Sequence, residues 1–179
     1  MAITLQQLLL DNTPNTSGVH EAMAQYAEHI FEELNGILPL FLGKKHLGSY
    51  INLTLPNAAV QSSETLIETL GDLILVYNLR MASFISSVRA QTTPDGEPKL
   101  GALLITADHT KTIFQLPWTL DFDDNAKLIQ HNRTQAQGEV IPSDTWASLF
   151  ITEANLATKA TAYARLVQRF GSENELPRP

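Results

Sequence analysis

Two amphipathic patterns lie near the two ends of this chain. From Val19 to Leu34, apolar residues recur at steps of three and four, and most acidic residues of that stretch fall between them. A second pattern with the same spacing runs from Glu153 to Phe170, and Gly171 follows it as the expected C-cap. Both stretches are therefore predicted to be helices that bury one face.

Strand patterns occupy the middle of the chain. Residues 50–55 alternate Ile51, Leu53 and Leu55 with polar side chains, the two-residue period of a half-buried strand, and a proline follows. A turn at 94–98 is expected to precede a further strand at 103–105. Residues 112–122 and 127–130 are expected to form a hairpin around a turn at 123–125. Strands in series between helices predict an α+β fold, an antiparallel β-meander flanked by N-terminal and C-terminal amphipathic helices.

Residues 62–90 allow two interpretations. Apolar residues recur at a helical spacing from Ile67 to Val88, which taken alone predicts one long helix. Gly71 and Asn78 are poor interior residues, however, and Leu73 to Tyr77 is an apolar run of the kind found in buried strands. We favour a helix up to Leu70 followed by strands.

Length and composition restrict the classes of protein. The 179 residues suit a single domain, predicted as 1–171 with a short N-terminal arm (1–16), while 172–179 form a polar, proline-rich tail that is not expected to order itself. Cysteine is absent, so the chain contains neither disulfides nor thiolate metal sites. No signal peptide or transmembrane run is visible. We expect a soluble protein of the host cytosol or of a virion, without a membrane partner.

Charge argues against nucleic acid as a partner. The formal net charge is −7, and the twelve Lys and Arg residues are scattered along the chain. The only basic cluster, Lys44-Lys45-His46, is typical of a solvated loop. No glycine-rich phosphate or dinucleotide motif is present, so no cofactor and no small-molecule substrate are predicted.

One stretch presents oxygen ligands at alternate positions, as a calcium loop does. Asp121, Asp123 and Asn125 have this spacing, but Ala126 replaces the central glycine and Asn132 stands where a bidentate glutamate is needed. An acidic hairpin turn explains the three residues better. Cation binding by this turn stays open.

Two other groups contain residue types used in catalysis. On the first long helix, Glu28 and Glu32 are four residues apart, as are His29 and Glu33, a spacing that brings side chains together but is also ordinary on a solvated face. Asp108-His109 is followed by threonines, yet no motif places a nucleophile beside this pair. No catalytic, cofactor or metal residues are assigned.

Protein contacts are the remaining prediction. The apolar run from 37 to 42 is expected in the core or against a partner. The interface candidates are Ile37, Leu38, Leu40, Phe41, Leu42 and Leu176. We expect a non-enzymatic structural or assembly protein that self-associates or co-assembles, with a phage or virus particle as a plausible setting. The alternatives are an acidic inhibitor, immunity or adaptor protein with a basic partner, and an enzyme without a recognisable motif.

Overall fold

The computed structural model describes residues 4–90, 99–134, 143–150 and 154–179. These residues form one six-stranded antiparallel sheet and a set of helices, which confirms the predicted α+β fold. The helices are α1 (Leu5–Asp11), α2 (Thr16–Leu34), α3 (Asn57–Val60), α4 (Ser63–Tyr77), α5 (Ser143–Leu149), α6 (Leu156–Phe170) and the 3₁₀ turn η1 (Glu173–Glu175). The strands are β1 (Leu40–Lys45), β2 (Tyr50–Thr54), β3 (Leu79–Ala90), β4 (Lys99–Asp108), β5 (Ile113–Phe122) and β6 (Leu128–Arg133).

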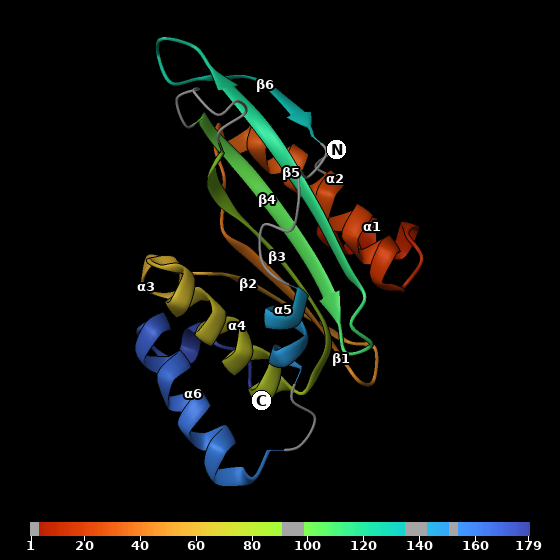
Figure 1. Ribbon diagram of the computed structural model, residues 1–179, viewed down its shortest axis with the longest axis vertical. Coiled ribbons are helices and arrows are strands. Elements are labelled where there is room, and N and C mark those ends of the chain that lie inside the picture. Colours follow the sequence, from red (N-terminus) through yellow and green to blue (C-terminus); the bar gives the residue numbers. More distant parts are fainter. Residues whose placement is uncertain (1–3, 91–98, 135–142, 151–153) are drawn as a thin grey trace. The chain divides into compact units, whose positions relative to one another are not determined.

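The strand order is β2-β1-β3-β4-β5-β6 (Figure 1). Strands β3 to β6 are neighbours in chain order, as a meander requires, and the β1–β2 hairpin lies beside β3. The chain divides into two compact units, residues 1–38, 83–106 and 113–140 in the first and residues 39–82, 107–112 and 141–179 in the second. The boundary falls within β3 and within β4, so both strands contribute to both units. The domain limits 1–171 stay a prediction.

In the first unit, α2 packs against β5 and β6. Asn15 caps the helix, its side chain accepting a hydrogen bond from the Gly18 N–H at 2.8 Å. Val19, Met23 and Ile30 of the predicted apolar face are buried, whereas Leu34 at its end is 57% exposed. The Phe31 ring meets Trp118 of β5 edge-on at 5.5 Å between centroids. Amphipathicity thus determines which face of α2 covers the hairpin.

The second unit contains α4 packed against α6. Asn155 caps α6, and Gly171 ends it with φ 81°, as its position after the apolar pattern predicts. The predicted earlier start, at Glu153, lies outside the described residues, and so does the predicted turn at 94–98. Within the described residues, no helix has the length and apolar character needed to cross a membrane.

The prediction for residues 62–90 was right in kind and wrong at the boundary. Helix α4 continues through Tyr77, so Leu73 to Tyr77 are helical and the strand begins at Leu79. Asn78, one of the two residues considered poor for a helix interior, adopts the left-handed conformation (φ 52°) and forms the C-cap of α4. The other, Gly71, lies inside the helix, where an added Cβ would be 3.4 Å from the Leu149 side chain. The apolar run is buried by helix packing, which periodicity alone does not distinguish from a strand.

The chain itself holds its C-terminal tail. Ser172 caps the η1 turn through the Asn174 N–H, and the Leu176 side chain is buried. The Tyr77 hydroxyl donates a hydrogen bond of 2.7 Å to the Pro177 carbonyl. The expectation that residues 172–179 would not order themselves was therefore wrong, because one tyrosine and one leucine position them.

Candidate functional site

The Asp108-His109 turn uses its polar groups to shape itself. One carboxylate oxygen of Asp108 accepts hydrogen bonds from the Thr110 N–H at 2.7 Å and the Thr112 N–H at 3.3 Å. The Thr110 hydroxyl donates to the same oxygen at 2.5 Å, and the His109 Nδ1 lies 3.2 Å from the Arg80 carbonyl. The histidine ring thus faces a backbone oxygen and not a threonine hydroxyl. This arrangement stabilises the turn between β4 and β5.

The candidate calcium turn also uses a carboxylate to stabilise its own backbone. Asp123 accepts hydrogen bonds from the Asn125 N–H at 2.9 Å and the Lys127 N–H at 2.8 Å, which closes the β5–β6 hairpin. Asp121 is instead 3.9 Å from the Lys99 ammonium. In the part of the chain that the structure describes, no three His, Asp or Glu side chains are grouped as metal ligands would be. The hairpin turn accounts for the spacing of these acids.

The glutamates of α2 are bound to basic residues of β6. The Arg133 guanidinium is 2.6 Å from Glu28 and 3.1 Å from Glu21, and the Trp118 indole N–H donates to Glu28 at 2.9 Å. Burial alone would raise the pKa of Glu28, but the hydrogen bonds from Arg133 and Trp118 outweigh it and lower that pKa below its ordinary value. The hydrogen bonds to Glu28 and Glu21 in turn raise the pKa of Arg133. Sequence reasoning missed Arg133 because it lies about one hundred residues away along the chain.

Two other glutamates of α2 lie beside histidines. His131 is 3.2 Å from Glu32, which is 69% exposed, and His29 is 3.2 Å from Glu33 on the next turn of the helix. The sequence placed His29 and Glu33 close together, and the structure pairs them with each other. The predicted solvated acidic face is therefore partly neutralised within the chain.

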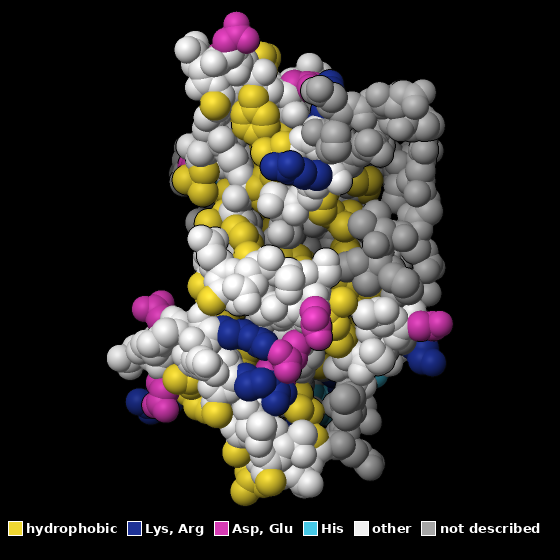
Figure 2. Space-filling model, turned by 60° about the vertical axis from the view of Figure 1, so that its left-hand side comes forward, with side chains coloured by type: hydrophobic (Ala, Val, Ile, Leu, Met, Phe, Trp, Pro, Cys, Tyr) yellow, Lys and Arg dark blue, Asp and Glu magenta, His cyan; other side chains and the backbone are white. Residues whose placement is uncertain are grey.

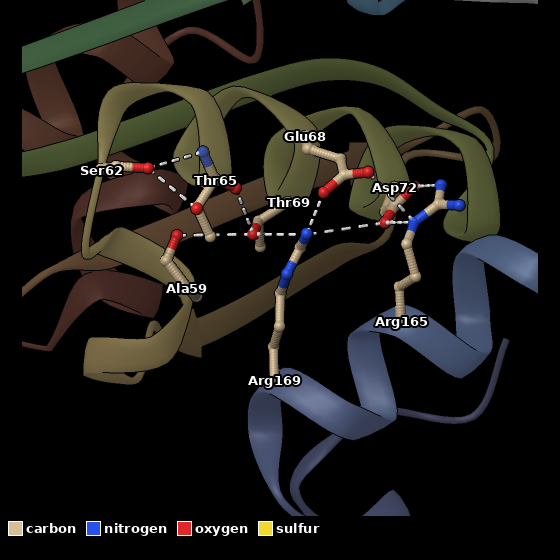
Figure 3. Close-up of polar contacts among 8 residues, drawn as sticks. All are labelled: Ala59, Ser62, Thr65, Glu68, Thr69, Asp72, Arg165 and Arg169. Carbon is tan, nitrogen blue, oxygen red and sulfur yellow. Dashed lines mark hydrogen bonds and ion pairs between the residues drawn. The ribbon is translucent and has the colours of Figure 1, made fainter.

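A second charged cluster joins α6 to α4 (Figure 3). Arg165 binds the buried Asp72 with both ends of its guanidinium, at 2.9 and 2.5 Å, and Arg169 reaches Glu68 and the Thr69 hydroxyl. A shallow hollow of about 330 Å³ borders this cluster, lined by Ala58, Gln61, Thr65, Arg165, Gln168 and Arg169. Since both guanidinium groups already bind carboxylates, the hollow offers little positive charge to an anion. The cluster is best explained as a clamp between two helices.

The predicted interface residues are mostly covered by their own chain. Leu40, Phe41 and Leu42 of β1 are between 0 and 4% exposed, and Leu176 is 7% exposed. Ile37 and Leu38, which precede β1, keep intermediate exposure. The apolar run thus supplies core residues, which explains its composition without a partner.

Strand β2 shows a different kind of surface, the open edge of the sheet. It pairs with β1 in a register that places Leu53 opposite Phe41 and Asn52 opposite Leu42. At the two ends of this ladder, the Leu55 N–H bonds the Pro39 carbonyl and the Lys45 N–H bonds the Ser49 carbonyl, each at 2.8 Å.

In an antiparallel pair, every second residue directs its N–H and C=O to the neighbouring strand. Leu55 and Ser49 use their backbone groups to bond β1, and so do the alternate residues between them. The remaining residues, Tyr50, Asn52 and Thr54, therefore direct their N–H and C=O groups to the open edge. The Asn52 and Thr54 side chains are exposed. No other described strand pairs with this edge.

The opposite edge of the sheet, β6, is better protected. Asn35, the C-cap of α2, donates its side-chain amide to the Ala126 carbonyl at 2.8 Å and accepts from the Leu128 N–H. The β5–β6 register is also broken between Asp121 and Phe122. A capped end, an irregular register and an edge arginine are devices that prevent strand pairing. Strand β2, with the sequence Tyr-Ile-Asn-Leu-Thr, contains no charged residue and no proline.

Sequence reasoning found strand β2 but not its edge position. The alternation of residues 50–55 predicts a half-buried strand, and the structure confirms it, with Ile51 and Leu53 buried. Whether a strand is central or terminal depends on long-range pairing, which the local pattern does not encode. No protein-family model, no curated protein and no solved structure matches this chain.

Proposed function

We propose that this chain is a non-enzymatic assembly protein that binds another protein chain by strand addition at β2. The observation that carries the proposal is the neutral, exposed backbone edge formed by Tyr50, Asn52 and Thr54. An added strand would satisfy these donors and acceptors, as in other proteins that bind extended segments at a sheet edge. Function then resides in a backbone surface, which needs no catalytic motif in the sequence.

Ion pairs within the chain support this proposal over the alternative of an acidic adaptor protein. Glu21 and Glu28 face Arg133 of their own chain, which reduces the negative field that a basic partner would meet. On the face drawn in Figure 2, basic and acidic side chains also lie against one another. Self-compensated charge favours recognition through hydrogen bonds and shape.

Light scattering behind a sizing column tests the proposal. We expect a mass that rises with protein concentration, and the variant N52K should shift it toward the monomer, because a lysine on an edge strand disfavours pairing. N132K is the matched control, since it makes the same substitution at an exposed position of β6. Equal behaviour of N52K and the wild type, alone and in capture of protein partners, would contradict the proposal.

A further inference from the structure

The edge of β2, with which no other described strand pairs, has a symmetry of its own. Its three outward-facing residues are evenly spaced about Asn52, and antiparallel strands pair by matching donors to acceptors at such positions. If a second copy is turned by 180° about an axis through Asn52, Tyr50 meets Thr54 of the copy and Asn52 meets Asn52. All three outward-facing residues then find a hydrogen-bonding partner, which is the self-complementarity that a two-fold interface requires.

The lack of charge on β2 lets a second copy pair at this edge. Each chain carries a formal charge of −7, a net charge that opposes contact between two copies. Strand β2 has no charged side chain, and symmetric pairing therefore places no like charges opposite each other. A charged peptide would find no opposite charge on β2 itself to select it.

The ends of β2 limit the paired segment. Pro56, which has no N–H, follows the strand after Leu55, and the β1–β2 turn precedes it. Leu47 in that turn is 94% exposed, and the same two-fold register directs the turn toward the region of Pro56 in the other copy. An exposed leucine and a proline would thus extend the contact at each end of the ladder.

We infer that two copies of this chain pair through β2 in antiparallel register, with Asn52 on the two-fold axis, to form a continuous twelve-stranded sheet. This inference rests on the proposed function and names its partner. A five-residue ladder buries less surface than a stable dimer usually does, so the association should be weak and depend on concentration.

Single cysteines test the register directly, because the natural chain contains none. In the proposed pair, the two Cα atoms at position 52 are about 5.5 Å apart, within the range that a disulfide spans. The two Cα atoms at position 54 are offset by four residues, or roughly 14 Å along the strands, which a disulfide cannot bridge. N52C should therefore form a disulfide dimer under mild oxidation at high protein concentration, and T54C should remain monomeric.

Two further samples sharpen this experiment. A mixture of Y50C and T54C should give a mixed disulfide, since the register pairs these two positions. Thiol titration of N52C and T54C should show similar accessibility, because both positions are exposed. Equal dimer yields from N52C and T54C, or no dimer from N52C, would overturn the inference.

The result also separates this inference from the proposed function. A mass above that of the monomer that N52K reduces, together with no N52C disulfide, would leave strand addition at β2 in place and reject the two-fold register. If N52K changes neither the mass nor the capture of protein partners, both are rejected.

Discussion

Acidification should destabilise this protein through one histidine, His20 of α2. Its Nδ1 lies 2.8 Å from the Thr106 hydroxyl, which lies 2.7 Å from the hydroxyl of the fully buried Ser83. The ring also packs at 5.5 Å from Phe114. Burial lowers the pKa of His20 to about 4, a shift that Glu21 opposes and Arg133 reinforces. The folded protein therefore holds this ring neutral at pH values where an unfolded chain protonates it.

The sign and the size of the effect follow from proton linkage. The unfolded state binds a proton near the ordinary pKa of 6.5 and the folded state only near 4, so the free energy of unfolding decreases as the pH falls between these values. At 1.36 kcal/mol for each unit of pKa difference, the full contribution is about 3 kcal/mol. Between pH 7.5 and 5.0, the loss from this residue alone comes to about 2 kcal/mol.

Urea unfolding at several pH values measures this contribution. The signal is the fluorescence of Trp118 and Trp146, both buried. H20N is the comparison protein, since an asparagine oxygen can accept from Thr106 near the position of Nδ1 and does not titrate. The packing cost of H20N is the same at every pH, and other titrating groups are common to both proteins. The wild type should lose about 2 kcal/mol more than H20N on going from pH 7.5 to 5.0. Equal losses would refute the reasoning.

Three further predictions concern stability, each measured by urea unfolding at pH 7.5. Y50F should leave the free energy of unfolding unchanged or raise it slightly, because the buried Tyr50 hydroxyl has no hydrogen-bond partner among the described residues. Y77F should lower it by about 1 kcal/mol, because it removes the hydrogen bond that holds the C-terminal tail. A larger loss in Y50F than in Y77F would contradict these roles of the two hydroxyl groups. N35G should cost about 1–2 kcal/mol by removing two hydrogen bonds to the β5–β6 turn. N78G should cost less, because the Asn78 side chain, at a left-handed cap, makes no hydrogen bond to the described residues, and equal costs would count against the role of the Asn35 amide. D72N should cost about 1–3 kcal/mol by leaving a guanidinium without its buried carboxylate, and a neutral effect would show that the clamp between α4 and α6 adds nothing to stability.

The elements with a clear period were predictable from sequence. Alternation at residues 50–55 identified β2, and helical spacing identified α2, because burial of one face imposes those periods on a chain. The end of α4 was not predictable in this way. A buried helix segment and a buried strand are both apolar, and only packing against α6 and the left-handed cap at Asn78 decide between them.

The candidate site was less accessible to sequence reasoning. Asp108, His109 and Asp123 attracted attention as reactive residue types, and the structure shows each of them in a turn. The surface that we propose as functional consists of backbone groups, which every residue has and which no motif records. Its signal in the sequence is an omission, the lack of any charge or proline from Tyr50 to Thr54.

The division of β3 and β4 between two compact units has a consequence for synthesis of the chain. Each unit is assembled from three separate stretches of sequence, so neither can be produced by cutting the chain once. All three stretches of the first unit have been synthesised once Val140 has left the ribosome. The second unit is complete only after α6, with its buried Leu166, has also been synthesised. During that interval, the apolar face of α4 that α6 later covers is not yet covered by it. A nascent chain halted at this point would expose that face to chaperones and would be prone to aggregation.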